Sequence, residues 1–305
     1  MANRFWVGGT GTWDASDTTH WAATSGGAGG VSVPTSGDAV TLDGSSGGGT
    51  VTVNTNFNLG ATGTLTMDTF TGTLDFATNN NSPSMRVFSS NGSATRTLNM
   101  GNGTWTMLNP GGGFESVWNA FSASNFTMNA NSSTLLLQPA SVTGYRAINA
   151  NGATFNNITV NNPTVSYEPI VINIFTLGLT CANLTLNNVR TVWWDRGGTT
   201  VTITGALTWA GGTGITDMAS IINDNDGTPN TLNVANATTI NWLALQGIIK
   251  TGAGSIVANN SIDLGRNSGI TINAPAIGGS STPPSLGSMM MQSGGVVRRN
   301  RVLAM

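Results

Sequence analysis

Charged side chains are scarce in this sequence. They make up 8% of its 305 residues, against about 25% in a typical globular protein. The 11 lysines and arginines and the 13 aspartates and glutamates nearly balance, and most of them are scattered. A protein that neutralises nucleic-acid phosphates needs a basic face. We therefore expect no nucleic-acid partner.

Cysteine is almost absent. Cys181 is the single cysteine and lies in the apolar run LGLTCANLTLN, so no disulfide can form within the chain. A nucleophilic thiol needs a basic partner, and the only histidine, His20, lies far away in the sequence, among tryptophans. We interpret Cys181 as a small buried side chain that fills the core.

Long hydrophobic runs are also missing. The apolar run IVINIFTLGLT (170–180) is well short of the roughly 20 residues that a membrane helix needs. The start of the chain, MANRFWVGG, does not lead from a basic region into an apolar one, as a cleavable signal peptide does. We expect synthesis in a cytosol, no cleavable export signal and no contact with a membrane.

The sequence does contain many short tetrads of the form apolar-Thr-apolar-Asn. Alternation with a period of two predicts strands, and the Gly, Asn and Ser clusters between the tetrads are typical of turns. Hardly any segment has a helical stripe, so we predict an all-β protein of more than a dozen short strands with one helical turn. The tetrads are VTVN (51–54), FTMN (126–129), ITVN (158–161), LTLN (184–187) and ITIN (270–273).

The spacing of the tetrads is irregular, whereas a barrel or sandwich of hairpins has regular strand intervals. A parallel β-helix, or β-solenoid, tolerates such spacing because insertions go into its turns. We predict about ten irregular coils over residues 50–275. The asparagine that closes each tetrad is expected to adopt the left-handed conformation at a strand corner and to form amide ladders between coils.

Residues 1–49 are too rich in glycine to form a coil of this kind, yet they carry four large aromatic side chains, Phe5, Trp6, Trp13 and Trp21. Both ends of a solenoid expose an open core and need a capping segment. We interpret the four aromatic residues as an N-terminal cap. The alternative is a platform of exposed tryptophan rings that binds carbohydrate.

Three motifs at the start of the chain carry a resemblance: WVGGTGTWD (6–14), HW (20–21) and VPTSGDAVTL (33–42). This region resembles the opening of β-solenoid proteins among bacteriophage structural and tail-fibre-like proteins, and more loosely the passenger regions of bacterial autotransporters. Autotransporters carry a signal peptide and a C-terminal membrane barrel. We expect neither from this sequence, so we favour the resemblance to the phage proteins.

The resemblance implies a non-enzymatic virion protein, a β-helical fibre or spike component of the tail, which assembles in the host cytoplasm. A β-helix with few charges and many exposed small side chains is also a natural protomer for a closed trimer, so we expect a homotrimer with other virion subunits as neighbours. Two alternatives remain: a head-surface fibre or capsid decoration protein, and a glycan-cleaving tailspike.

Glycan cleavage requires two suitably spaced carboxylates, and acidic residues are few. The best candidate for a carbohydrate site is Asp195, beside Trp193, Trp194 and Arg196, because an aromatic floor with an acid and a guanidinium can hold a sugar. The alternative is that Asp195 and Arg196 form an ion pair in a turn. We keep these four residues as the candidate glycan-binding site and expect no catalytic residue.

Metal and cofactor sites are not expected. The stretch NDNDGT (223–228) resembles half of a calcium loop, but Ile222 stands where the loop needs an acid. The glycine runs lack the Lys-Ser/Thr of a phosphate-binding loop. An ice-binding face needs Thr-x-Thr in regular steps, and here these triplets occur early and out of step.

Residues 276–305 change character. A Pro/Gly/Ser linker leads to a methionine triplet, Met289, Met290 and Met291, and then to a basic-apolar end. Methionine packs against varied surfaces and arginine binds carboxylates. We interpret the segment as a docking tail for a partner subunit or another copy of the chain; the alternative is a frayed end. Its arginines are Arg298, Arg299 and Arg301.

Overall fold

The computed structural model describes residues 1–108, 114–120, 123–138, 145–166, 170–171, 178–194, 198–223 and 228–276. Of residues 114–115, 145, 166, 170–171 and 193–194 it describes the backbone alone. Within these ranges the protein is all-β, and the one helix is a short 3-10 turn, η1 (Gly44–Ser46), capped by Asp43. The all-β prediction is confirmed, and every tetrad falls in or overlaps a strand.

The described strands form four sheets, which we name A to D. Sheet A has 12 strands, in the spatial order β3 (Trp21–Ala22), β1 (Asn3–Trp6), β4 (Ala39–Thr41), β6 (Thr64–Thr66), β9 (Val87–Ser89), β12 (Phe114–Asn119), β15 (Tyr145–Asn149), β17 (Ile170–Val171), β19 (Thr191–Trp194), β22 (Ala219–Asn223), β25 (Leu243–Gln246) and β28 (Ile262–Asp263).

The other three sheets are shorter. Sheet B consists of β2 (Gly11–Trp13), β5 (Gly49–Val53), β7 (Gly72–Asp75), β10 (Arg96–Asn99) and β13 (Phe126–Asn129). Sheet C consists of β8 (Ser84–Met85), β11 (Thr104–Met107), β14 (Thr134–Leu137), β16 (Thr154–Ser166), β18 (Leu179–Val189), β20 (Thr200–Ile203), β23 (Asn230–Val234) and β26 (Ile248–Thr251), with β21 (Leu207–Trp209) also paired to β18. Sheet D consists of β24 (Thr238–Asn241), β27 (Ile256–Asn259) and β29 (Thr271–Ile272).

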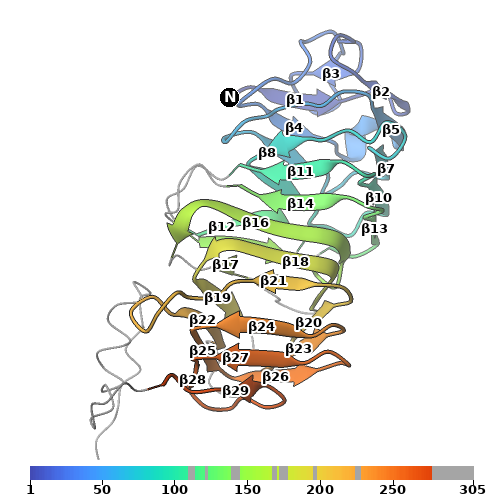
Figure 1. The fold of residues 1–305 in the computed structure, drawn as a ribbon. Helices are drawn as coiled ribbons and strands as arrows, with labels where there is room; N and C mark the ends of the chain where they lie inside the picture. The colour runs from blue at the N-terminus through green and yellow to red at the C-terminus, as the bar shows by residue number, and fades with distance from the viewer. Residues whose placement is uncertain are drawn as a thin grey trace, which may run out of the picture.

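Pairing between the named strands is parallel, apart from β1 with β3, which is antiparallel. Strands that follow one another in the chain mostly belong to different sheets. Sheet A extends along the whole stack, while sheets B, C and D each cover part of it, and the sheets run side by side along an elongated column (Figure 1). The turn at Asn151 and Gly152 illustrates the rule: it joins β15 of sheet A to β16 of sheet C, and therefore makes no hairpin.

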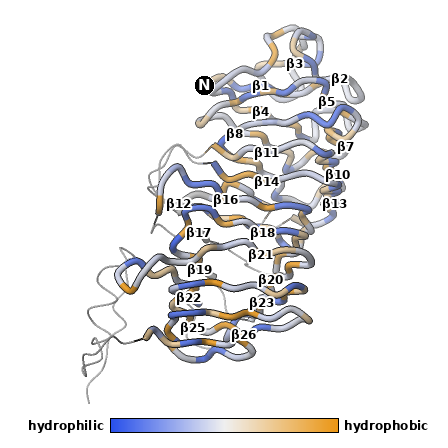
Figure 2. The backbone as a smooth tube through the Cα atoms, viewed as in Figure 1, coloured by the Kyte–Doolittle hydropathy of each residue, from blue (hydrophilic) through white to orange (hydrophobic). Residues whose placement is uncertain are grey.

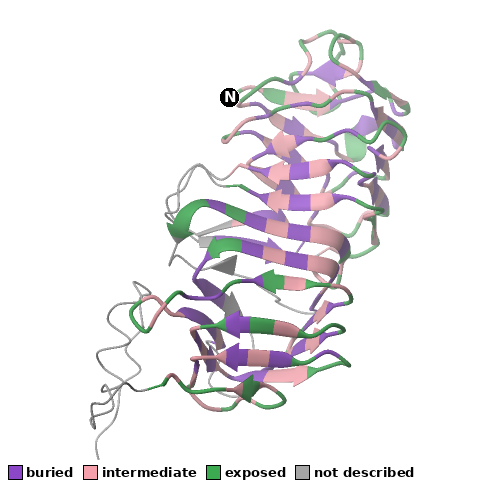
Figure 3. Ribbon diagram, in the orientation of Figure 1, coloured by how far each residue is buried: buried purple, intermediate pink, exposed green. Residues whose placement is uncertain are grey.

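The core lies between the sheets. Hydrophobic and hydrophilic residues alternate along the strands (Figure 2), and so do buried and partly exposed ones (Figure 3). A row of aromatic rings runs through the upper core, with centroids 4.2–6.0 Å apart, and adds edge and stacking contacts to the burial of apolar area. The rings belong to Trp13, Phe57, Phe76, Trp105, Trp118 and Phe155.

The prediction for the tetrad asparagines is half right. Asn129 donates an amide hydrogen bond to Asn99 (2.8 Å), and Asn273 donates one to Asn259 (2.7 Å), so amide ladders between circuits exist. The predicted left-handed backbone is wrong, because no asparagine that closes a tetrad has a positive φ. Left-handed asparagines lie elsewhere, for example in the turns at Asn131 and Asn260.

The threonines of sheet B are in step in space, although their sequence spacing is irregular. Thr50, Thr73, Thr97 and Thr127 are register partners along β5, β7, β10 and β13. Turn insertions change the number of residues between strands but leave the register intact. The neighbouring row contains an aspartate and two asparagines in place of threonine, so the face still lacks a repeated Thr-x-Thr pattern.

Candidate functional site

The N-terminal tryptophans are buried. Trp6, Trp13 and Trp21 are 0%, 1% and 0% exposed. Trp21 makes edge contacts with the other two rings, and Trp13 stacks on Phe57 with centroids 4.2 Å apart. Phe5 is partly exposed. Since the three indole rings have no free face, they cannot act as a platform on which a sugar stacks.

His20 belongs to this cluster. Its ring stacks on Trp6 at 4.6 Å, and its Nδ1 lies 2.8 Å from the carbonyl oxygen of Val7, to which it donates. A Cβ on Gly11 would lie 2.6 Å from the histidine Nε2 and 2.9 Å from the Trp6 ring, so no larger residue fits. The glycine-tryptophan motif of residues 6–14 therefore has a packing explanation.

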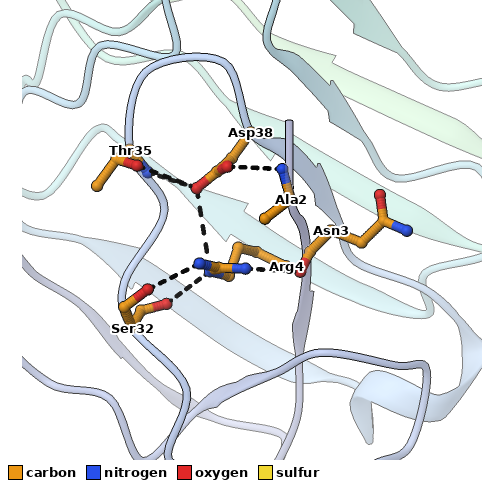
Figure 4. A network of polar contacts seen from close by, with 6 residues as sticks. All are labelled: Ala2, Asn3, Arg4, Ser32, Thr35 and Asp38. Carbon is orange, nitrogen blue, oxygen red and sulfur yellow. Dashed lines mark hydrogen bonds and ion pairs between the residues drawn. The ribbon is translucent and has the colours of Figure 1, made fainter.

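A polar network ties the first strand to the loop before β4 (Figure 4). Asp38 is 5% exposed and accepts hydrogen bonds from the backbone of Ala2 (3.0 Å) and from both the backbone and the hydroxyl of Thr35. Arg4 lies 3.9 Å from the same carboxylate and donates to the backbone and side-chain oxygens of Ser32.

Burial raises the pKa of Asp38, but the hydrogen bonds from Thr35 and Ala2, together with Arg4, outweigh it and hold the pKa below its ordinary value. Both carboxylate oxygens are engaged, so the group is suited to fastening the chain rather than to transferring protons. This network accounts for the Asp in the motif VPTSGDAVTL.

The described surface also has a hollowed region beside β13, which we call the ledge. It comprises two adjoining hollows of about 270 Å³ and 440 Å³, which share Met128 and Thr154. All lining side chains are uncharged. They belong to Ala123, Phe126, Met128, Asn129, Ala130, Asn131, Ala150, Asn151, Gly152, Ala153, Thr154, Phe155, Asn156, Thr180, Ala182 and Thr204.

No family model, curated protein or solved structure matches this chain.

The predicted glycan site is only partly described. The backbones of Trp193 and Trp194 lie in β19, where they pair with Ile222 and Asn223 of β22. Their side chains, and all of Asp195 and Arg196, lie outside the described residues. The docking residues, Met289–Met291, Arg298, Arg299 and Arg301, lie outside them as well.

An ion pair that we did not predict lies close to β19 in sequence. Arg190 forms a bidentate pair with Asp217 (2.9 and 3.0 Å), and its third nitrogen donates to the carbonyl oxygen of Gly211. The pair holds the loop between β21 and β22 against the end of β18. The two residues are 27 positions apart, so no local pattern connects them.

No group of three His, Cys, Asp or Glu side chains in the described ranges could hold a metal ion. Cys181 is fully buried, and burial raises the pKa of its thiol to about 12, so the reactive thiolate is suppressed near neutral pH. Among the described residues, no helix is long and apolar enough to span a membrane.

Proposed function

We propose that this protein is a parallel β-helix that serves as a non-enzymatic structural component of a bacteriophage particle, as a fibre or spike of the tail. The observation that supports this most is the strand register. From β1 to β28, sheet A gains one parallel strand per circuit, with sheets B, C and D beside it. Such a continuous stack makes a stiff rod, which suits a fibre.

In this proposal residues 1–49 are the cap, residues 50–275 the β-helix and residues 276–305 a linker with a docking tail. The cap is supported by β3, which reverses direction and ends sheet A, and by the buried tryptophans beneath it. Sheets A and B pass through residue 49 without interruption, since β4 pairs with β6 and β5 pairs with β7. The cap is therefore part of the same stack.

The proposed partners are other virion subunits and two further copies of the chain. The threonine row of sheet B is uncharged, and Asp75 in the neighbouring row accepts hydrogen bonds from Ala77 and Thr78, so this face can be brought against another copy without burying an unpaired charge. Host-surface polysaccharide is a proposed ligand of Trp193, Trp194, Asp195 and Arg196. The proposed location is the virion, after assembly in the host cytoplasm.

The decisive experiment is electron microscopy of phage particles from the source lysate, labelled with a gold-conjugated antibody against the chain. Label on the tail is expected. Label on the head surface would favour the decoration-protein alternative, and particles without label would refute the virion proposal.

A second experiment tests the non-enzymatic part of the proposal. Purified protein incubated with host-surface polysaccharide is expected to release no reducing or unsaturated ends. Release that disappears in Asp195→Asn would instead identify a glycan-cleaving spike.

A further inference from the structure

Sheet B stops at β13, whereas sheets A and C continue to the far end of the column (Figure 1). The reason is that the next circuit follows a shorter path. In one circuit Ser133 comes ten residues after Ala123, with β13 between them, whereas in the next circuit Asn157 comes only six residues after Asn151. The circuits touch at both ends of this stretch, where Asn151 donates to the carbonyl oxygen of Ala123 (2.7 Å) and Asn157 donates to that of Ser133 (3.1 Å). Between these contacts β13 overhangs the ledge.

The edge of β13 that faces away from β10 carries backbone N–H and C=O groups that β10 does not bind. The carbonyl oxygens of Asn125 and Asn129 accept from β10, namely from the backbone N–H groups of Arg96 and Met100. Backbone groups alternate sides along a parallel strand, so the N–H and C=O groups of Phe126 and Met128 face the ledge. Among the described strands, β13 pairs only with β10. An edge of this kind is a template for an added strand.

The ledge carries both polar and apolar side chains, and its apolar part is held in place. Phe126, Met128 and Ala153 are partly buried and pack against the main core. The guanidinium of Arg96 lies 5.3 Å from the centroid of the Phe126 ring and is itself fixed by Ser90, through the hydroxyl (2.8 Å) and the carbonyl oxygen (2.7 Å). An occupant would therefore meet a preformed surface with no charged lining residue.

We propose that Ser288–Gln292 of the same chain adds to β13 as the sixth strand of sheet B and lays methionine side chains on the ledge. The proposal rests on the docking role inferred above for residues 276–305, but assigns the methionine part of that role to a surface of the same chain in place of a partner. Within that segment, Ser288–Gln292 contains three consecutive methionines and no charge, and methionine adapts its shape to irregular surfaces such as the one formed by Phe126, Met128 and Ala153. The arginines at 298, 299 and 301 would be poorly matched to an uncharged ledge, and they stay available for a partner subunit.

The chain length allows this arrangement. The last described residue, Ala276, follows the end of β29 by four residues. Successive strands in one sheet lie about 4.8 Å apart. Five such spacings separate the level of β29 from the level of Thr154 in β16, a distance of about 24 Å along the column. The 12 residues from Ala276 to Ser288 can span about 40 Å, which leaves length for crossing from sheet D to sheet B.

Disulfide trapping tests the proposal. In a Cys181→Ala background, Thr127→Cys on β13 is combined in turn with Met289→Cys, Met290→Cys and Met291→Cys. Neighbouring strands bring Cα atoms within bonding range, so at least one pair is expected to cross-link within a single chain under mild oxidation. The matched control is Thr50→Cys, in the same threonine row but three strands further away, which should not cross-link.

Equal cross-linking of Thr127→Cys and Thr50→Cys would mean that the segment does not dock on β13 and would overturn the proposal. Cross-links between differently tagged chains, in place of those within one chain, would assign the ledge to a second copy and would also overturn it.

Hydrogen exchange provides an independent measurement in the full chain. Replacing the three methionines by serine is expected to speed exchange at the Phe126 and Met128 amides by about tenfold or more, because their hydrogen bonds to the added strand are lost. Replacing Arg298, Arg299 and Arg301 by glutamine should leave that exchange unchanged and reduce incorporation into particles. Unchanged exchange in the methionine variant would refute docking on the ledge, even if incorporation into particles confirmed the proposed function.

Discussion

Replacing Trp13 by alanine should remove much of the stability of the N-terminal end. Trp13 is 1% exposed, stacks on Phe57 at 4.2 Å and meets Trp21 edge-on at 4.9 Å. Truncation exposes or leaves unfilled about 200 Å² of apolar surface, worth about 5 kcal/mol at about 25 cal/mol per Å². Because an unfolded chain already buries part of that area, about 3–4.5 kcal/mol remains, which agrees with the roughly 3–5 kcal/mol measured for truncated core aromatics.

The assay is thermal and urea unfolding of both proteins, followed by far-ultraviolet circular dichroism. An unfolding entropy of about 2.1 cal/mol/K per residue gives about 0.6 kcal/mol/K for 305 residues. A loss of about 4 kcal/mol therefore lowers Tm by about 6 °C if the chain unfolds cooperatively. In the proposed β-helix, stability is distributed among neighbouring circuits, so hydrogen exchange should accelerate most in β1, β2 and β5 and least in β25.

The control is Phe5→Ala in strand β1 of sheet A, where the ring is partly exposed; its loss should be less than half that of Trp13→Ala. Trp13→Ala should also aggregate end to end, because it loosens the structure that covers the first strand edges. A Trp13→Ala protein within about 1 kcal/mol of the parent, and still monodisperse, would refute the interpretation of these tryptophans as a cap.

Three further outcomes are expected. The folded-state pKa of Asp38 is lowered from its ordinary value of 3.8, so the ionised carboxylate stabilises the fold above that pH, and this contribution is lost as the pH falls through the folded pKa. Asp38→Asn should therefore lower Tm at pH 7, and the difference from the parent should shrink below about pH 3.8. A Tm difference that does not depend on pH would contradict the assignment. Asp217→Asn should cost about 1.5–3 kcal/mol in urea unfolding, since it weakens charge-assisted hydrogen bonds to an Arg190 side chain that is only 7% exposed; a loss below about 0.5 kcal/mol would show that the loop does not depend on this pair. Cys181, whose pKa burial raises to about 12, should react with a maleimide at pH 7.5 only after unfolding in urea, and rapid labelling of the native protein would show that its site is open.

Part of the candidate site could be foreseen from local pattern. The cluster Trp6, Trp13 and Trp21 in a glycine-rich stretch predicts an aromatic assembly outside the regular repeat, and the structure places these three rings together. The pattern did not tell whether the rings lie buried or exposed, because burial depends on Phe57, 36 residues beyond Trp21, and on strand β3 folding back over β1. The role of Gly11 likewise becomes evident only once His20 lies against it.

The sequence by itself determined the element type. An apolar-Thr-apolar-Asn tetrad alternates with a period of two over only four residues, so the preference for a strand is local and needs no distant partner. For this reason segments such as FTMN and LTLN become strands wherever they fall in the chain.

Only the tertiary structure decided which strands become neighbours. Turns of different length separate Thr73, Thr97 and Thr127 by unequal intervals, yet the burial of every second side chain holds them in one register. The same freedom in the turns created the ledge, since one circuit takes the long path through β13 and the next takes the short path from Asn151 to Asn157. Local alternation carries no information about the path length of an adjacent circuit, so the end of sheet B, the Arg190–Asp217 pair and the overhanging edge of β13 arise only from the packing of one circuit on another.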